Sequence, residues 1–197
     1  MRVSKVSKAQ IIDHARREVL THGFHAVRVE DIAAALGMSK KTFYQHFENK
    51  EALVRAVAVT TMSAMFSEID PVLQGDGHAL RKISALIESV ARRFDHLPAS
   101  APADLQRHYP AVWGELMANR RAFLQRYAKV LAAGQRRGEV RRDFSAQALT
   151  AMVVAIVEAI GNPSFLQQSK LELSDALRLI RALLVGGLSA RAQEETR

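Results

Sequence analysis

Residues 40–47, Lys-Lys-Thr-Phe-Tyr-Gln-His-Phe, combine side chains that could bind a hydrogen-bonding anion. In a helix, Phe43 and Phe47 fall on one side because they are four residues apart. The rest of the helix surface is then left to polar side chains, namely Lys40, Lys41, Thr42, Tyr44, Gln45 and His46. A helix anchored by aromatic residues and edged with cations and amides can lie in a groove of DNA, with hydroxyl and ammonium groups on phosphates and amides on base edges.

A short stretch upstream must position this helix. Residues 28–36 carry apolar side chains at helical spacing, which predicts a second helix. Gly37 can take the left-handed conformation that ends this helix. Ser39 can accept hydrogen bonds from the unpaired backbone N–H groups at the start of the next one. Residues 28–47 therefore read as a helix-turn-helix motif.

The stretch 23–53 resembles the DNA-binding motif of the tetracycline-repressor (TetR) family of transcriptional regulators. The resemblance rests on Gly23, Phe24, Ala26, Asp31, Ile32, Ala33, Gly37, Ser39, Thr42, Phe43, Tyr44, His46, Phe47, Asn49, Lys50, Glu51, Ala52 and Leu53. The joint spacing of these residues makes the match specific. The match covers the first third of the chain, and the remainder resembles the family only in length, helicity and layout.

The resemblance implies which side chains meet DNA. Thr42, Tyr44, His46 and Lys50 stand at positions that usually contact phosphates in this family. Lys40, Lys41 and Gln45 are the expected readers of base edges, because Lys can donate to guanine and Gln can pair with adenine. The predicted DNA-binding set is Arg28, Ser39, Lys40, Lys41, Thr42, Tyr44, Gln45, His46 and Lys50.

Arg28 departs from the family pattern. The family commonly has Ser or Thr at the start of this helix, and Arg has no side-chain oxygen with which to cap it. Arg28 could instead reach a phosphate through a charge-assisted hydrogen bond, or it could simply be solvated. The sequence leaves both alternatives open.

Charge and composition agree with an anionic partner near the N-terminus. The 197-residue chain has a net charge of +8, and residues 1–50 contribute +4 of it, with nine Lys and Arg against five Asp and Glu. A generally basic soluble surface would give the same count. No apolar run looks long enough to span a membrane, and the N-terminus lacks the apolar segment of a signal peptide. We therefore expect a cytoplasmic protein with no membrane partner.

No sequence motif indicates a catalytic site, a metal site or a phosphate-binding loop. The chain has no cysteine, and no two of its seven histidines stand four residues apart with a convincing carboxylate partner. Gly75-Asp76-Gly77 follows no strand and is expected to be a turn, and no serine lies in the context of a nucleophile elbow. We predict no catalytic residue, no metal site, no cofactor and no enzyme activity.

The apolar periodicity predicts an all-α protein of about nine helices. A three-helix bundle with the helix-turn-helix motif comes first and a larger helical domain follows, with residues 5–65 and 66–197 as the predicted domains. Asp70-Pro71 is expected to end the fourth helix, and Ser174 to cap the last. The expected helices are 8–22, 28–36, 40–47, 50–69, 78–96, 103–108, 110–137, 146–160 and 175–190.

Methionine and aromatic residues of the larger half form a second notable set: Met62, Met65, Phe66, Phe94, His108, Tyr109, Trp113, Met117 and Tyr127. Their pattern alone is that of an ordinary core. The family resemblance implies a pocket for an apolar or amphipathic effector among these helices, which adaptable Met and broad aromatic faces would suit. The candidates for orienting a polar group of the effector are His108, Tyr109, Asn119 and Arg120.

The helix at 146–160 is apolar nearly all round and must be covered on two sides. It could complete a monomer core, or it could form a four-helix interface with a second copy through the last two long helices. The resemblance favours the homodimer.

Together these features predict a ligand-responsive repressor that a small effector releases from a pseudopalindromic DNA operator. The alternatives are a small-molecule-binding protein with a vestigial DNA motif and a sequence-indifferent architectural DNA binder.

Overall fold

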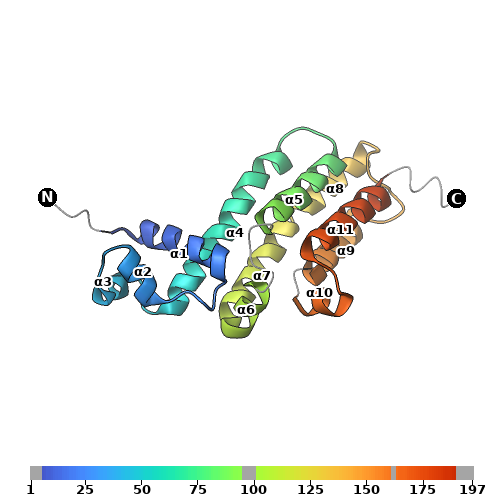
Figure 1. Cartoon of the computed structure of the whole chain (residues 1–197). Coiled ribbons are helices and arrows are strands. Elements are labelled where there is room, and N and C mark those ends of the chain that lie inside the picture. The colour runs from blue at the N-terminus through green and yellow to red at the C-terminus, as the bar shows by residue number, and fades with distance from the viewer. Residues whose placement is uncertain (1–5, 95–100, 161–162, 190–197) are drawn as a thin grey trace. The chain divides into compact units, whose positions relative to one another are not determined.

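The structure, a computed structural model, describes residues 6–94, 101–160 and 163–189, and helices dominate these ranges (Figure 1). Within them no strand forms beyond one isolated antiparallel bridge between Val140 and Ser189. The predicted all-α fold is confirmed. The helices are α1 (Lys8–His22), α2 (Val29–Ala35), α3 (Lys40–His46), α4 (Lys50–Gln74), α5 (Ala79–Phe94), α6 (Ala101–His108), α7 (Pro110–Leu124), α8 (Tyr127–Arg136), α9 (Ala146–Ile160), α10 (Pro163–Ser169) and α11 (Leu173–Leu188).

The prediction that Asp70-Pro71 ends the fourth helix is wrong, because α4 continues through Pro71 to Gln74. Proline removes one backbone N–H and crowds the preceding turn, but neighbouring contacts offset that cost. Leu73, beyond the proline, is buried, and the Gln74 side chain donates to Asp70 at 3.2 Å. Tertiary burial therefore overrides the local signal.

The long helix predicted at 110–137 is two helices. α7 ends at Leu124 and α8 begins at Tyr127, and the turn between them is held by backbone bonds such as Arg126 N–H to the Phe123 carbonyl at 3.0 Å. Apolar residues continue at helical spacing through this turn, so periodicity alone does not reveal it.

The C-terminal region differs from expectation in two places. α10, a helix of seven residues, is absent from the expected set. The last helix begins at Leu173, preceded by Glu172, so the prediction of Ser174 as its cap is wrong.

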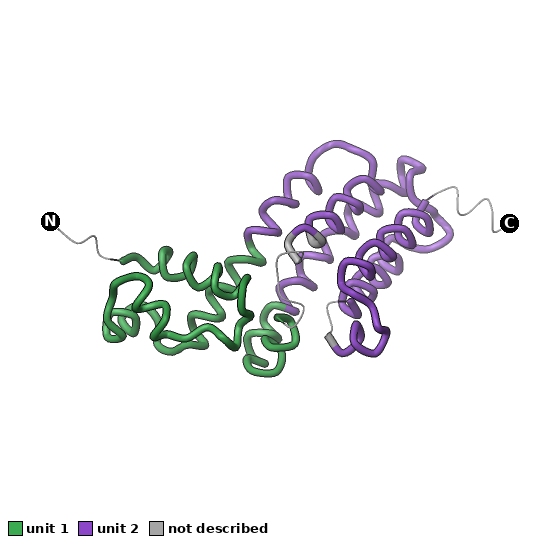
Figure 2. Tube along the Cα trace, in the orientation of Figure 1, with its two compact units in different colours: residues 1–63, 96–116 green, residues 64–95, 117–197 purple. Residues whose placement is uncertain are grey.

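The chain forms two compact units, shown in different colours in Figure 2. Unit 1 consists of residues 1–63 and 96–116, and unit 2 of residues 64–95 and 117–197. α4 and α7 each begin in unit 1 and end in unit 2. The functional division into 5–65 and 66–197 stays a prediction.

Four helices of unit 2 form a closed ring of packing partners. α5 packs against α8, α8 against α9, α9 against α11, and α11 against α5. Each helix turns an apolar stripe inward, as a bundle requires. The buried side chains include Ile83, Leu86, Ile87, Tyr127, Leu131, Val153, Val154, Ile180 and Leu184.

Gly134 allows α5 and α8 to approach closely. A Cβ atom at this position would lie 2.6 Å from the Cβ of Ala79 and 2.7 Å from a methyl carbon of Val140. No side chain fits there without displacing α5.

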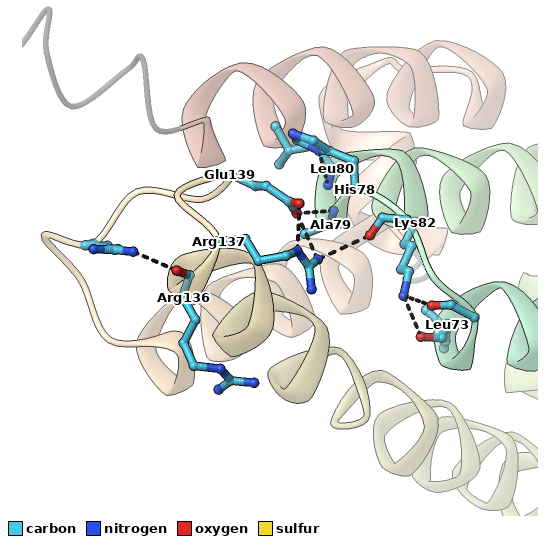
Figure 3. A network of polar contacts seen from close by, with 11 residues as sticks. Leu73, His78, Ala79, Leu80, Lys82, Arg136, Arg137 and Glu139 are labelled. Atoms are coloured by element: carbon cyan, nitrogen blue, oxygen red, sulfur yellow. Dashed lines mark hydrogen bonds and ion pairs between the residues drawn. The ribbon is translucent and has the colours of Figure 1, made fainter.

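Glu139, just after α8, ties the start of α5 in place (Figure 3). Its carboxylate accepts from the Ala79 backbone N–H at 2.7 Å and from the Arg137 guanidinium at 2.7 and 2.9 Å. Arg137 also donates to the Gly77 carbonyl at 3.2 Å, and Lys82 donates to a carbonyl at the end of α4 at 3.0 Å. The Arg137 guanidinium and the Ala79 N–H lower the pKa of Glu139 to about 2.

α4 is the one described helix that could cross a membrane by length and composition, contrary to the expectation from the sequence. Buried core helices of folded proteins meet the same criterion. Leu53, Val57 and Ile69 of α4 are each at most 3% exposed, so much of this apolar surface is used in packing.

We expect Glu139→Gln to lower the free energy of unfolding by about 1–2 kcal/mol at pH 7, because the charge-assisted cap of α5 is weakened. The pKa of Glu139 is depressed on folding, so the stabilisation is complete above its ordinary pKa of 4.5 and fades as pH falls through about 2. Urea unfolding followed by circular dichroism at several pH values measures this difference. Glu172→Gln is the matched control, since Glu172 precedes α11 without a side-chain capping bond. A loss of equal size in both variants would contradict the assignment.

Candidate nucleic-acid interface

The N-terminal bundle is held together by side chains that α1, α2 and α3 turn inward. Ile11, Ile32 and Phe43 are fully buried, and Phe47 is 3% exposed. The rings of Phe43 and Phe47 lie 5.5 Å apart, and the Lys8 ammonium lies 5.0 Å above the Phe47 ring. The prediction that these two phenylalanines anchor α3 from one side is confirmed.

Local capping sets where α3 begins. Gly37 has φ +62°, the left-handed conformation that ends the preceding helical segment. The Ser39 hydroxyl accepts from the Thr42 backbone N–H at 3.1 Å and lies 3.0 Å from the Thr42 hydroxyl. Both predictions for this turn are confirmed, and Ser39 and Thr42 form a single hydroxyl pair at the helix start.

The outer face of α3 carries Lys41, Tyr44 and Gln45, all exposed. The Tyr44 ring is 52% exposed and packs edge-on against Phe43, with ring centroids 5.4 Å apart. This contact fixes the base of the ring and leaves its hydroxyl toward solvent. The three side chains give α3 an ammonium, a phenol and an amide on one accessible surface.

The ammonium of Lys40 already has a partner that the sequence does not indicate. Its ammonium forms an ion pair with Glu30 of α2 at 2.5 Å, and this pairing raises the pKa of Lys40 and lowers the pKa of Glu30. Both side chains are more than half exposed, so the pair is worth little in stability. Lys40 must leave Glu30 to reach a base.

Lys50 already has contacts within unit 1, and the Nε2 atom of His46 is buried there. The Lys50 ammonium donates to the His25 carbonyl at 3.0 Å and lies 6.0 Å from the centre of the Tyr109 ring. The Nε2 atom of His46 is buried, with no hydrogen-bond partner among the described residues. Their predicted phosphate contacts remain predictions, and for Lys50 the contact would replace an existing bond.

Arg28 stands immediately before α2 in an extended conformation and makes no side-chain capping bond. It is exposed, beside a helix start whose first turn also holds Glu30 and Asp31. Both alternatives for this residue, phosphate contact and simple solvation, stay open.

No sequence pattern indicates the contacts of α6 with the loop after α1. The imidazole rings of His25 and His108 stack with centroids 4.1 Å apart, although the two residues lie far apart in the chain. A Cβ at Gly23, whose φ is +81°, would lie 3.0 Å from an Asp104 carboxylate oxygen. Within unit 1, α6 therefore supports the loop that leads into the helix-turn-helix motif.

The predicted pocket residues are divided between the two units. Met62, His108, Tyr109 and Trp113 belong to unit 1, where His108 and Tyr109 have the partners described above. Met65, Phe66, Met117 and Tyr127 belong to unit 2, and the side chain of Phe94 lies outside the described residues. In unit 2, Phe66 stacks on Phe123 with ring centroids 4.0 Å apart. The pocket stays a prediction.

Within the described ranges, no three His, Asp or Glu side chains gather closely enough to hold a metal ion.

Comparison with known proteins agrees with the geometry of the N-terminal bundle. The family model for bacterial regulatory proteins of the tetR family matches residues 11–57, from α1 into α4. Residues 11–57 therefore match the DNA-binding region of this family.

Relatives extend the likeness over most of the chain. The transcriptional repressor DhaR of Mycobacterium sp. strain GP1 is 24% identical over 75% of this chain and 77% of its own. FadR of Bacillus subtilis, solved with stearoyl-CoA, is 19% identical with a TM-score of 0.63, covering 92% of this chain and all of its own. A regulator from Saccharomonospora viridis, solved with choline, is 20% identical with a TM-score of 0.71, covering 92% and 97%.

We expect Arg28→Thr to raise the free energy of unfolding by about 1 kcal/mol, because a side-chain oxygen would then cap α2. If Arg28 contacts a phosphate, the same variant also weakens operator binding and lowers the slope of log affinity against log salt by about 1. Urea unfolding and fluorescence anisotropy on labelled operator measure the two effects. Arg28→Ala is the control, since it removes the charge without adding a cap. Unchanged operator affinity in both variants would establish that Arg28 is only solvated.

Proposed function

We propose that this protein is a TetR-family repressor that binds a pseudopalindromic operator as a homodimer and is released by a small apolar or amphipathic effector. The observation that carries the DNA-binding part is the exposed face of α3. Lys41, Tyr44 and Gln45 project from a helix whose position is fixed by two buried phenylalanines and the Ser39 cap. An α-helix with such a face suits the major groove.

The homodimer is supported by exposed apolar side chains on two helices that pack together. Met152 of α9 is 61% exposed, and Leu179 and Leu183 of α11 are 50% and 61% exposed. Leu179 and Leu183 are four residues apart and share one face of α11. Large apolar side chains grouped on neighbouring helices indicate an interface, and a second copy would cover them.

Release by an effector requires two states that bind it with different affinity. α4 and α7 are each continuous from unit 1 into unit 2, so a change in unit 2 has a covalent helical route to the DNA-binding bundle. The complexes of relatives with stearoyl-CoA and with choline support a small-molecule effector here but differ in its chemistry. The relatives are transcriptional regulators rather than enzymes, which supports a non-enzymatic, cytoplasmic role.

The test begins with DNA fragments that the purified protein retains from its own genome. We expect Lys41→Ala/Tyr44→Ala to weaken binding to the retained fragment by at least about thirtyfold, since two contacts of about 1–3 kcal/mol each are lost. Fluorescence anisotropy at several salt concentrations measures the affinity. Lys129→Ala, on the exposed surface of α8, is the control for loss of one positive charge.

Two outcomes would favour the alternatives. Unchanged affinity in the double variant would remove α3 as the recognition helix, as expected for a vestigial motif. Equal competition by unrelated DNA at fixed salt would indicate an architectural DNA binder.

We expect Leu183→Lys to convert the dimer to a monomer, because a charge would be buried at the centre of the interface. Sedimentation velocity measures the mass, and operator affinity should fall with it since paired half-sites need paired helices. Val72→Lys is the matched control, an exposed apolar side chain of α4 outside α9 and α11. A dimer that survives Leu183→Lys would place the interface elsewhere.

A further inference from the structure

Unit 2 contains three buried polar atoms with no hydrogen-bond partner among the described residues. They are Ser89 Oγ on α5, Arg120 Nε on α7 and the Tyr127 hydroxyl on α8. Buried polar groups are normally paired, and each unpaired one costs about 1–3 kcal/mol. Such atoms can take a hydrogen-bond partner from beyond the described residues.

Arg120 lies on the buried side of α7. Leu116, four residues before it, and Phe123, three residues after it, are 5% and 3% exposed. Within the described part of the chain the Arg120 guanidinium forms no hydrogen bond or ion pair, because the nearby Glu158 carboxylate accepts from Arg121 at 2.7 Å. Burial lowers the pKa of Arg120, yet a guanidinium keeps its charge in proteins. The Arg120 side chain is half-buried, and within the described residues no carboxylate binds its positive charge.

Tyr127 is the first residue of α8, and its side chain is fully buried. Its ring meets Phe123 edge-on, with centroids 6.1 Å apart, and Phe123 stacks on Phe66. Asp70 lies near enough to act on Tyr127, but its carboxylate accepts from Arg126 at 2.6 Å. The Tyr127 hydroxyl therefore sits at the end of an aromatic wall without a partner.

Ser89 comes near the level of Tyr127 through the register of α5 against α8. The C-terminal end of α8 meets the N-terminal end of α5 at Gly134 and Ala79, and the two helices pack side by side, so they run antiparallel (Figure 1). Seven residues back from 134 lead to Tyr127, where α8 begins, and seven residues along α5 from 79 lead to 86. Because both helices rise by the same distance per residue, Ser89 lies within about one helical turn of the level of Tyr127.

We infer that the effector of this regulator is an amphipathic anion that binds in unit 2, with a compact acidic group on Arg120 and an apolar body along the Phe66–Phe123 wall. Hydroxyls of Ser89 and Tyr127 supply further hydrogen bonds to the acidic group. An anion is required because a half-buried, unpaired guanidinium gains more from a negative charge than from a neutral acceptor. The inference rests on the proposed effector-responsive function and names the chemistry of its ligand.

The test compares four probes that share a decyl chain: decanoate, decyl phosphate, decan-1-ol and decyltrimethylammonium. By isothermal titration calorimetry we expect the wild-type protein to bind one of the anions at least about tenfold more tightly than the alcohol or the cation. The tighter anion tells whether the natural acidic group resembles a carboxylate or a phosphate. Arg120→Gln should remove the preference for the anion and leave decan-1-ol binding within about twofold.

Arg136→Gln is the matched control, the same change at an exposed position of α8 in the same unit. It should keep the wild-type ranking of the probes, whereas Tyr127→Phe should weaken anion binding a few-fold. The inference would be overturned if the wild-type protein bound acid and alcohol equally, preferred the cation or bound no probe. These outcomes are measured on the wild-type protein, so they do not depend on whether a variant folds. Operator binding by the ligand-free protein is measured in parallel, so a failure of the proposed DNA-binding function is recognised separately.

Discussion

The burial of Phe43 and Phe47 is the contact on which the DNA-binding surface depends. α3 has only seven residues, and isolated helices of that length are unstable in water. The two rings fix α3 against α1 and α2, and the Ser39 cap fixes where it begins. Packing on one face thereby determines which polar side chains the opposite face presents. Without that packing, Lys41, Tyr44 and Gln45 would have no common surface.

The features that the sequence predicted well are those with short-range causes. Gly37 and Ser39 act within one turn of their positions, and the aromatic spacing of α3 is visible in four residues of sequence. The all-α fold follows from apolar periodicity that extends over whole helices. The misplaced boundaries, at Pro71 and at Ser174, occur where tertiary contacts decide which residue ends or begins a helix.

Parts of the site that sequence could not reveal involve residues far apart in the chain. The stack of His25 on His108 and the bond from Lys50 to the His25 carbonyl depend on where α6 folds back against the first loop. Likewise, the family resemblance names Arg120 as a candidate for orienting a polar group of the effector, but the sequence does not show that its neighbours Leu116 and Phe123 are buried. The ligands of relatives, one a long-chain thioester and one a quaternary amine, show that this fold alone does not determine an effector. The polar atoms inside unit 2 are what distinguish this chain.

The Lys40–Glu30 pair has a consequence for how the regulator would search a genome. An ammonium already neutralised by a carboxylate releases few counterions on meeting a random phosphate, so it adds little to binding at unrelated sequences. If Lys40 reads a base, as predicted, it exchanges Glu30 for the acceptors of a guanine. The ion pair would then make the contribution of Lys40 to binding smaller at unrelated sequences than at a site with that guanine.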